Sequence, residues 1–316
     1  KTYGDRRGAA YGLSAVVKGL GIAALKQHNV MGTLEEACKG TSIGGKQGAL
    51  FAFECLVARL GLLFEPYVIV ILPLLLKACS DASDHVRDAA QGTARVVMAN
   101  LTAHGVKLVL PKMLEALEDS AWRTKQAAIQ LLGAMAYCAP RQLSSCLPQI
   151  VPRLTSAFSD THPTVQAAGR AALQDIGLVV RNPEVSQLLP TIMVALSDPA
   201  KQTKSALDAL LACEFMHSID APSLALLIPV LQRGLRDRVA DVKRKAALIT
   251  GNMCSMISGA KDLLPYLPAV MPGLQNVLLD PIPDVRSTSA KALISLMRGL
   301  GEENLPELLP WLMDTL

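Results

Sequence analysis

Apolar residues along the chain recur at helical spacing, and prolines and aspartates interrupt them at regular intervals. Apolar runs such as SQLLP and LALLIP lead into a proline, which precedes an aspartate by eight residues. Spacings of three and four residues between apolar positions predict amphipathic helices rather than strands. The proline–aspartate pairs are Pro73 and Asp81, Pro111 and Asp119, Pro152 and Asp160, Pro190 and Asp198, Pro229 and Asp237, and Pro272 and Asp280.

Successive aspartates of these pairs lie 38 to 43 residues apart, which identifies an internal repeat. Five residues after each aspartate comes a β-branched residue, usually followed by a basic one and then by an alanine-rich helix. We therefore predict a unit of helix A, a short turn and helix B. The pairs at the start of helix B are Val86-Arg87, Thr124-Lys125, Val165-Gln166, Thr203-Lys204, Val242-Lys243 and Val285-Arg286.

This is the pattern of HEAT repeats, and it predicts an all-α fold. Because one unit cannot bury its apolar face alone, repeats stack into an α-solenoid, expected to be elongated and curved, with about seven full repeats plus two half repeats. We expect a single solenoid over residues 1–316, with degenerate repeats in 1–61 and regular proline-containing repeats in 62–316. Within the first part, residues 22–39 should form a degenerate helix A and 43–60 the next helix B.

The prolines allow two interpretations. Apolar residues at helical spacing precede them, so we place them inside helix A, as kinks that set the curvature, although an interior proline costs a helix about 3 kcal/mol. The alternative is that a helix begins at each proline.

Composition narrows the class of protein. A hydrophobic content of 51% with 18% charged residues excludes a disordered chain, and 4% aromatic residues favour helices over a sandwich or barrel. The seven cysteines include no C-x-x-C pair and are interpreted as buried thiols of a cytoplasmic protein. The apolar run Val68–Leu76 is too short to span a bilayer, so no membrane partner is expected. The chain begins and ends within a repeat, as expected of a central fragment of a longer one.

The stretch GTSIGGKQG, residues 40–48, is close to a phosphate-binding loop. Gln47 stands where that loop needs a hydroxyl for magnesium, and Lys46 occupies the position of the basic residues at the start of helix B. We interpret the glycines as a loose turn between helices and expect no nucleotide cofactor. A nucleotide-dependent enzyme acting through residues 40–47 is the least favoured hypothesis.

No pattern of catalytic or metal-ligating residues stands out. The five histidines lack a second ligand at helical spacing, and no nucleophile motif is present, so we predict neither a catalytic nor a metal site and no enzyme activity. Asp84, Asp241 and Asp284 precede the valine–basic pairs and are interpreted as helix N-caps that also face a basic side chain of a neighbouring repeat.

Two surface features are candidate partner contacts. Trp122 lies in the turn between helices A and B beside Arg123, where a core role is hard to arrange. The stretch QRGLRDRVADVKRK concentrates cations on another turn, either to contact an acidic partner such as ribosomal RNA or as a solvated turn with internal ion pairs. The full candidate set is Trp122, Arg123, Lys204, Arg233, Arg236, Arg238, Lys243, Arg244, Lys245 and Arg286.

The stretch LIPVLQRGLRDRVADVKRKAALITGNMC resembles the HEAT region of fungal translation elongation factor three. The stretches DRRGAAYGLSAVVKGLG, GGKQGALFAFECL and EDSAWRTKQAAIQLLGAMAYCAPRQLS resemble the elongation-factor-three-like segment of the large general-control HEAT family. Members of that family are ribosome-associated activators of the kinase that phosphorylates initiation factor two alpha. No ATPase cassette is present here, so the enzymatic half of elongation factor three does not carry over.

The resemblance implies a non-catalytic scaffold that acts in translation regulation and the integrated stress response. Its implied partners are the ribosome, through protein and rRNA, an ATP-binding-cassette protein, and the kinase through other parts of the full-length protein. The alternative from fold alone is a HEAT-repeat nuclear transport receptor or phosphatase scaffold. A formal charge of +4 disfavours a transport receptor, whose inner surface is generally acidic.

Overall fold

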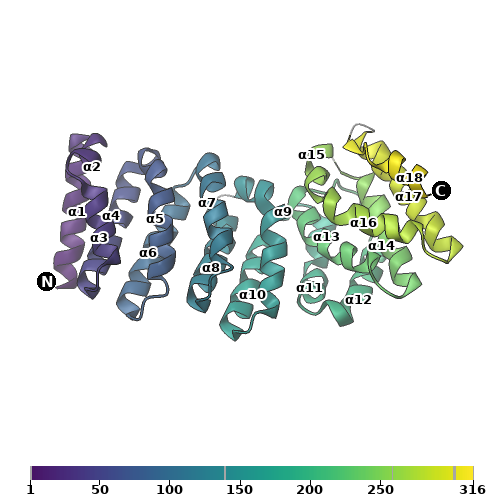
Figure 1. The fold of residues 1–316 in the computed structure, drawn as a ribbon, viewed down its shortest axis with the longest axis horizontal. Helices are drawn as coiled ribbons and strands as arrows, with labels where there is room; N and C mark the ends of the chain where they lie inside the picture. Colours follow the sequence, from purple (N-terminus) through teal and green to yellow (C-terminus); the bar gives the residue numbers. More distant parts are fainter. Residues whose placement is uncertain (1, 139, 258, 302–303, 316) are drawn as a thin grey trace. The chain divides into compact units, whose positions relative to one another are not determined.

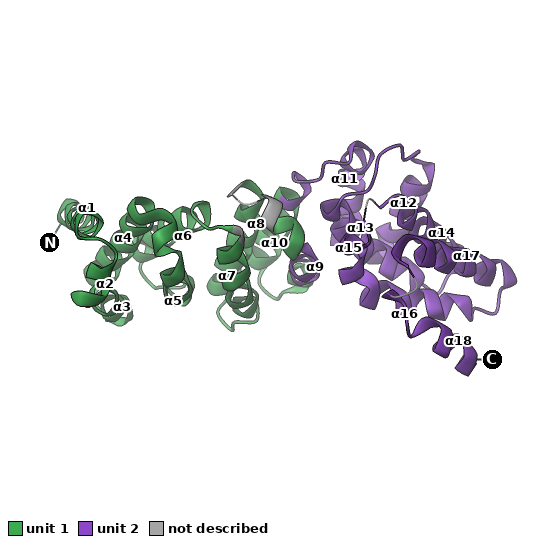
Figure 2. Cartoon of the chain, turned by 90° about the horizontal axis from the view of Figure 1, so that it is seen from above, with its two compact units in different colours: residues 1–146, 156–175 green, residues 147–155, 176–316 purple. Residues whose placement is uncertain are grey.

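The chain is helical throughout the part that its computed structural model describes, residues 2–138, 140–257, 259–301 and 304–315 (Figure 1). Within these residues the only β-type pairing is one isolated parallel bridge between Ile219 and Ile257. The predicted all-α fold of paired helices is therefore confirmed. The chain divides into two compact units, coloured separately in Figure 2.

Unit 1 comprises Lys1–Cys146 and Ser156–Asp175. Its helices are α1 (Tyr3–Leu20), α2 (Ala23–Gln27), α3 (Val30–Lys39), α4 (Ile43–Leu60), the 3-10 turn η1 (Gly61–Phe64), α5 (Glu65–Ala78), α6 (Asp84–Ala99), α7 (Ala103–Ala116), α8 (Trp122–Cys138), the 3-10 turn η2 (Ala157–Ser159) and α10 (Pro163–Gly177), whose last two residues fall in unit 2.

Unit 2 comprises Leu147–Thr155 and Ile176–Leu316. It takes most of α9 (Pro140–Ser156) and holds α11 (Pro183–Ser197), α12 (Pro199–Ala212), α13 (Ala221–Leu235), α14 (Ala240–Cys254), α15 (Ala260–Leu263), the 3-10 turn η3 (Leu264–Tyr266), α16 (Leu267–Leu278), α17 (Pro283–Leu300) and α18 (Leu308–Thr315).

Each unit has two layers of helices. In unit 1 the B helices α1, α4, α6 and α8 pack in succession, while the A helices α5 and α7 pack beside each other and against their B partners α6 and α8. In unit 2 the A helices α11, α13 and α16 form one layer and the B helices α12, α14 and α17 the other. Stacking of like helices gives each unit a core that continues from repeat to repeat, as expected of HEAT repeats.

The repeat prolines lie inside the A helices, as predicted. The alternative, that helices begin at these prolines, is wrong. The helices begin well upstream, for example at Asn182, which caps α11 by accepting from the Val185 amide at 2.7 Å. That the prolines set the curvature stays a prediction. The interior prolines are Pro73 in α5, Pro111 in α7, Pro152 in α9, Pro190 in α11, Pro229 in α13 and Pro272 in α16.

Small residues let the B helices approach closely. The alanine pairs of helix B are buried, and Ala90, Ala128 and Ala246 have no exposed surface. Between α8 and α10, a Cβ placed on Gly133 would lie 2.9 Å from the Cα of Ala172. Only glycine fits at that crossing, because the obstructing atom belongs to the backbone.

The first 61 residues show how the degenerate repeat differs from the others. Helix α4 has the bounds predicted for it, Ile43–Leu60. The expected helix A over residues 22–39 is divided into α2 and α3 at Asn29, whose φ of 46° lies in the left-handed region. Asparagine tolerates that conformation better than most side chains, so the break falls where the sequence permits it.

The stretch Ile43–Ala78 is the one part of the described chain that is long and apolar enough to cross a membrane, by length and composition only. It consists of two helices, α4 and α5, with η1 between them. Helix α4 packs against α1 and α6, and α5 packs against α6 and α7. Many apolar residues of this stretch, such as Leu50, Leu56 and Ile71, therefore serve as core of the helical stack.

Candidate functional site

The repeated aspartate closes the turn between helices A and B. In five of the six motif aspartates, all except Asp198, one carboxylate oxygen, Oδ1, accepts a hydrogen bond from the backbone amide two residues later, which fixes the orientation of the side chain. The donor amides are those of Ser83 to Asp81 (2.9 Å), Ala121 to Asp119 (2.7 Å), His162 to Asp160 (2.8 Å), Val239 to Asp237 (2.8 Å) and Ile282 to Asp280 (3.0 Å).

The second oxygen, Oδ2, accepts a lysine ammonium from the preceding repeat at three of these turns. The pairs are Lys46 Nζ to Asp81 at 2.6 Å, Lys125 Nζ to Asp160 at 2.9 Å and Lys243 Nζ to Asp280 at 2.5 Å. All three aspartates are nearly buried, with side chains 14%, 13% and 3% exposed. We call this series the lysine–aspartate ladder; it joins each of these repeats to the next.

Arginine or glutamine at the same position behaves differently. Arg87 Nη1 donates to the carbonyls of Asp81 and Ala82 in its own turn, at 2.7 and 2.9 Å. Arg286 does the same with Asp280 and Pro281, at 2.9 Å each. Gln166 Nε2 donates to the Asp160 carbonyl at 2.8 Å. These side chains brace a turn instead of joining two repeats.

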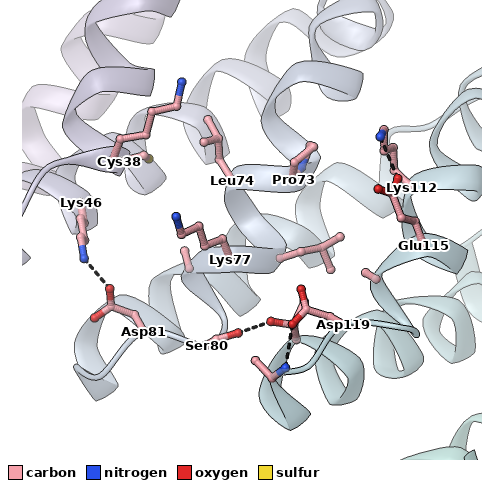
Figure 3. A pocket seen from close by; sticks show the side chains of 16 residues that line it. Cys38, Lys46, Pro73, Leu74, Lys77, Ser80, Asp81, Lys112, Glu115 and Asp119 are labelled. Atoms are coloured by element: carbon pink, nitrogen blue, oxygen red, sulfur yellow. Dashed lines mark hydrogen bonds and ion pairs between the residues drawn. The ribbon is translucent and has the colours of Figure 1, made fainter.

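The near-match to a phosphate-binding loop has a structural explanation. The ammonium of Lys46 is committed to Asp81 in the ladder (Figure 3), and Gln47 is buried. The Gln47 side chain accepts from Arg6 at 2.7 Å and donates to the His85 carbonyl at 3.2 Å. A helix, α3, precedes the glycines where a phosphate-binding loop needs a strand.

The loose turn expected at these glycines is wrong in part. Helix α4 begins at Ile43, because the Ser42 side chain caps it by accepting from the Gly45 amide at 3.2 Å. Gly45 and Lys46 therefore lie in the first turn of the helix. Gly40 is the only residue of the motif's Gly40, Gly45 and Lys46 that lies in the connection between α3 and α4.

The predicted N-caps Asp84, Asp241 and Asp284 are also wrong. The N-cap residues are Ser83, Val239 and Ile282, and the three aspartates lie in the first helical turn. In each of these turns the motif aspartate accepts from the backbone amide of the N-cap residue. The expected contact with a neighbouring repeat holds for Asp284, whose Oδ2 lies 3.7 Å from Arg244 Nε.

The basic turn of unit 2 divides into paired and unpaired cations. Lys243 belongs to the ladder, Arg244 pairs with Asp241 at 3.1 Å, and Lys245 lies 2.7 Å from both Asp208 and Asp241. These three cations are largely neutralised. The other candidates, Lys204, Arg233, Arg236 and Arg238, are exposed and make no ion pair with any described residue. Arg286 is exposed while it braces its own turn.

Trp122 heads α8 in unit 1 and is half-buried. Its ring stacks on His162, with 3.9 Å between ring centroids and 8° between planes. The guanidinium carbon of Arg123 lies 4.5 Å from the centre of the indole, close enough for a cation–π contact. The two site candidates predicted in this turn, Trp122 and Arg123, therefore touch each other.

The cysteines fit their predicted role only partly. Cys55, Cys79, Cys146 and Cys254 are buried, but Cys38 and Cys213 are half-buried. Burial raises the pKa of the Cys38 thiol to about 11 and that of Cys79 to about 12, so both are protonated at neutral pH. The side chain of Cys138 lies outside the described residues. Among the described residues, no cluster of three or more potential metal ligands occurs.

Two protein-family models match the chain. The family described as "EF3 N-terminal HEAT repeat" matches residues 6–173, and "Elongation factor 3/GNC1 HEAT repeat" matches residues 200–307. The chain belongs to the EF3-type HEAT-repeat family. This membership confirms the resemblance found in the sequence and agrees with the two layers of helices in each unit.

Individual relatives of this chain are similar to it over nearly all of its length. It is 54% identical to the human "Stalled ribosome sensor GCN1" over 99% of its length, and 50% identical to the "eIF-2-alpha kinase activator GCN1" of Dictyostelium discoideum over 99%. It spans 12% of each of these relatives. The solved structure of Kap121p bound to Pho4p aligns with 98% of the chain and 33% of Kap121p, at a TM-score of 0.50 and 18% identity. That likeness concerns the fold alone.

Proposed function

We propose that the chain is one segment of a non-catalytic scaffold that helps to activate the kinase of initiation factor two alpha when ribosomes stall or amino acids are scarce. The observation that carries the proposal is 50 to 54% identity, over 99% of this chain, to proteins named for that activation and for sensing stalled ribosomes. The place of action is the cytoplasm. The kinase is contacted through other parts of the full-length protein.

The proposed partners of this segment are the ribosome and an ATP-binding-cassette protein. Membership of a family shared with elongation factor 3 supports a ribosomal partner, since elongation factors act on ribosomes. The exposed guanidinium groups of Arg233, Arg236 and Arg238 suit phosphate recognition, because their charges are not spent on internal ion pairs. We call these residues, together with Lys204 and Arg286, the open basic turn, and we propose rRNA as its ligand.

A crosslinking experiment tests the partners. The purified chain is mixed with purified ribosomes, with and without the cassette protein, crosslinked through lysines, and sedimented. We expect crosslinks to ribosomal proteins near the open basic turn, and stronger recovery when the cassette protein is present. A chain that stays in the supernatant under both conditions at low salt would contradict the proposal.

A further inference from the structure

The lysine–aspartate ladder is interrupted at Asp119. In the preceding repeat the position that should supply its lysine is Arg87, and that guanidinium donates to the carbonyls of Asp81 and Ala82 instead. The Asp119 Oδ1 atom is held by the Ala121 amide at 2.7 Å, as in the other turns. Its Oδ2 atom, which elsewhere accepts an ammonium, has no hydrogen bond to any described residue, and the side chain is exposed.

A neutral contact joins the two repeats at this point. The Ser80 hydroxyl, in the turn that follows α5, hydrogen-bonds to the hydroxyl of Thr124, which is 6% exposed (Figure 3). The junction is therefore closed without the Asp119 carboxylate. That carboxylate keeps the orientation of a ladder aspartate but remains free to bind a cation from outside the chain.

A groove of about 600 Å³ opens beside Asp119 (Figure 3). Its lining includes Pro73 and Leu74 of α5, and Ala116 and Ala121 beside the carboxylate. Apolar walls next to a carboxylate without an ion pair suit a side chain with a long hydrocarbon stem and a cationic end, because lysine buries its methylenes while its ammonium keeps a polar partner.

Most other charges in the groove are already paired. Lys46 is bound to Asp81, Lys112 to Glu115 at 2.8 Å, and Lys39 to Glu35 at 3.6 Å. Lys77 is the lining cation that has no ion pair with a described residue, and it is exposed. Its ammonium opposes a cationic ligand, so its removal should strengthen binding.

We propose that this groove receives a lysine side chain from a basic segment of a partner protein, with the ammonium on Asp119 Oδ2. The incoming lysine takes the place that Lys46, Lys125 and Lys243 take at the other turns, and so completes the ladder in trans. The proposal is independent of the ribosome-binding function, since it concerns unit 1 and a ligand of the opposite charge.

Fluorescence of Trp122, three residues from Asp119, can report occupancy of the groove. The only other tryptophan, Trp311, is replaced by Phe to give the parent protein. The probe is a capped peptide of alternating lysine and glycine, and the comparison probe has glutamate in place of lysine. We expect saturable binding of the lysine peptide that weakens with salt, and none of the glutamate peptide.

Four variants of the parent separate this site from general attraction. Asp119→Asn should lower the affinity by about fivefold, the upper range for one exposed ion pair. Arg87→Lys should lower the affinity for the peptide similarly, since the ammonium introduced at position 87 can then occupy Asp119 from within the chain. Lys77→Met should raise it. Asp237→Asn, at the other turn with an open Oδ2, should leave it unchanged.

Several outcomes would overturn the proposal. Equal affinity for the parent and Asp119→Asn would do so, as would equal losses in Asp119→Asn and Asp237→Asn. Tighter binding of the glutamate peptide would show an anion site at Lys77 instead. Circular dichroism confirms the fold of each variant, and Asp119→Asn should fold like the parent because its amide oxygen can still accept from Ala121.

Discussion

At the scale of single residues, lysine and arginine perform different tasks at one repeat position. Lysine carries one compact ammonium on a flexible stem, and Lys46, Lys125 and Lys243 reach the aspartate of the next repeat, although Lys204 does not. The arginine fork instead fits two carbonyls of its own turn. The sequence carried a signal for the ladder that spacing alone could have exposed. Lys46 and Asp81 are 35 residues apart, as are Lys125 and Asp160, while Lys243 and Asp280 are 37 apart.

The pairing of the basic turn could not be predicted in the same way. Lys245 reaches Asp208, a residue of the previous B helix, and that contact depends on how α12 and α14 pack. The sequence showed six cations in one stretch, and the structure leaves Arg233, Arg236 and Arg238 unpaired among the described residues. Tertiary packing therefore decides which charges are available to a partner.

The ladder predicts a pH dependence of stability. The Lys243 ammonium, followed by the Ile282 amide, holds the pKa of Asp280 below its ordinary value of 3.8. A carboxyl with a lower pKa in the folded than in the unfolded state stabilises the fold above about pH 4 and loses that stabilisation as the pH falls through the folded pKa. Lys243→Met should therefore lower the melting temperature at neutral pH, with a smaller difference from the parent near pH 3.

Melting curves by circular dichroism between about pH 3 and pH 7 test this expectation. Arg238→Met is the matched control, since it removes one exposed cation that has no described ion pair. Its melting temperature should follow the parent at every pH. A Lys243→Met deficit that stays constant across the whole range would show that lost packing, not the ion pair, causes the destabilisation.

At the scale of helices, the sequence determined most of the architecture. Helix α4 has its predicted bounds, and the repeat prolines lie inside their helices, because apolar periodicity before each proline is a strong signal. Helix starts were predicted less well. Val239 and Ile282 are N-cap residues with apolar side chains, which propensity rules for N-caps do not favour, and Asp237 and Asp280 accept from their backbone amides.

The close crossing of α8 and α10 predicts the cost of one substitution. In Gly133→Ala the new Cβ would lie 2.9 Å from the Cα of Ala172, so the two helices must separate. Overpacking of this kind costs about 1–3 kcal/mol of unfolding free energy. Urea unfolding measures the change.

Gly8→Ala is the control for that substitution. Gly8 lies inside α1, and a Cβ there would meet no atom within 4 Å. Alanine should then stabilise unit 1 by about 0.5–1 kcal/mol through its better helix propensity. Equal effects of the two substitutions would refute the packing argument for Gly133.

At the scale of the whole chain, the sequence was enough to predict the fold and the family. The fold and family followed from the period of about 40 residues and from specific stretches such as QRGLRDRVADVKRK. The set of candidate partner contacts could be reduced only with the structure, which shows that Lys243, Arg244 and Lys245 are in internal ion pairs. The ladder thus joins neighbouring repeats, and we propose the open basic turn as the contact for an anionic partner.

The salt dependence of ribosome binding tests this division most directly. Arg236→Gln/Arg238→Gln is compared with Lys18→Gln/Lys26→Gln, which removes two exposed cations of unit 1 and matches the change in net charge. If both arginines contact rRNA phosphates, the first variant should weaken cosedimentation and reduce the slope of log affinity against log salt by about two units. The second should bind like the parent. Identical slopes for the parent and both variants would contradict the account.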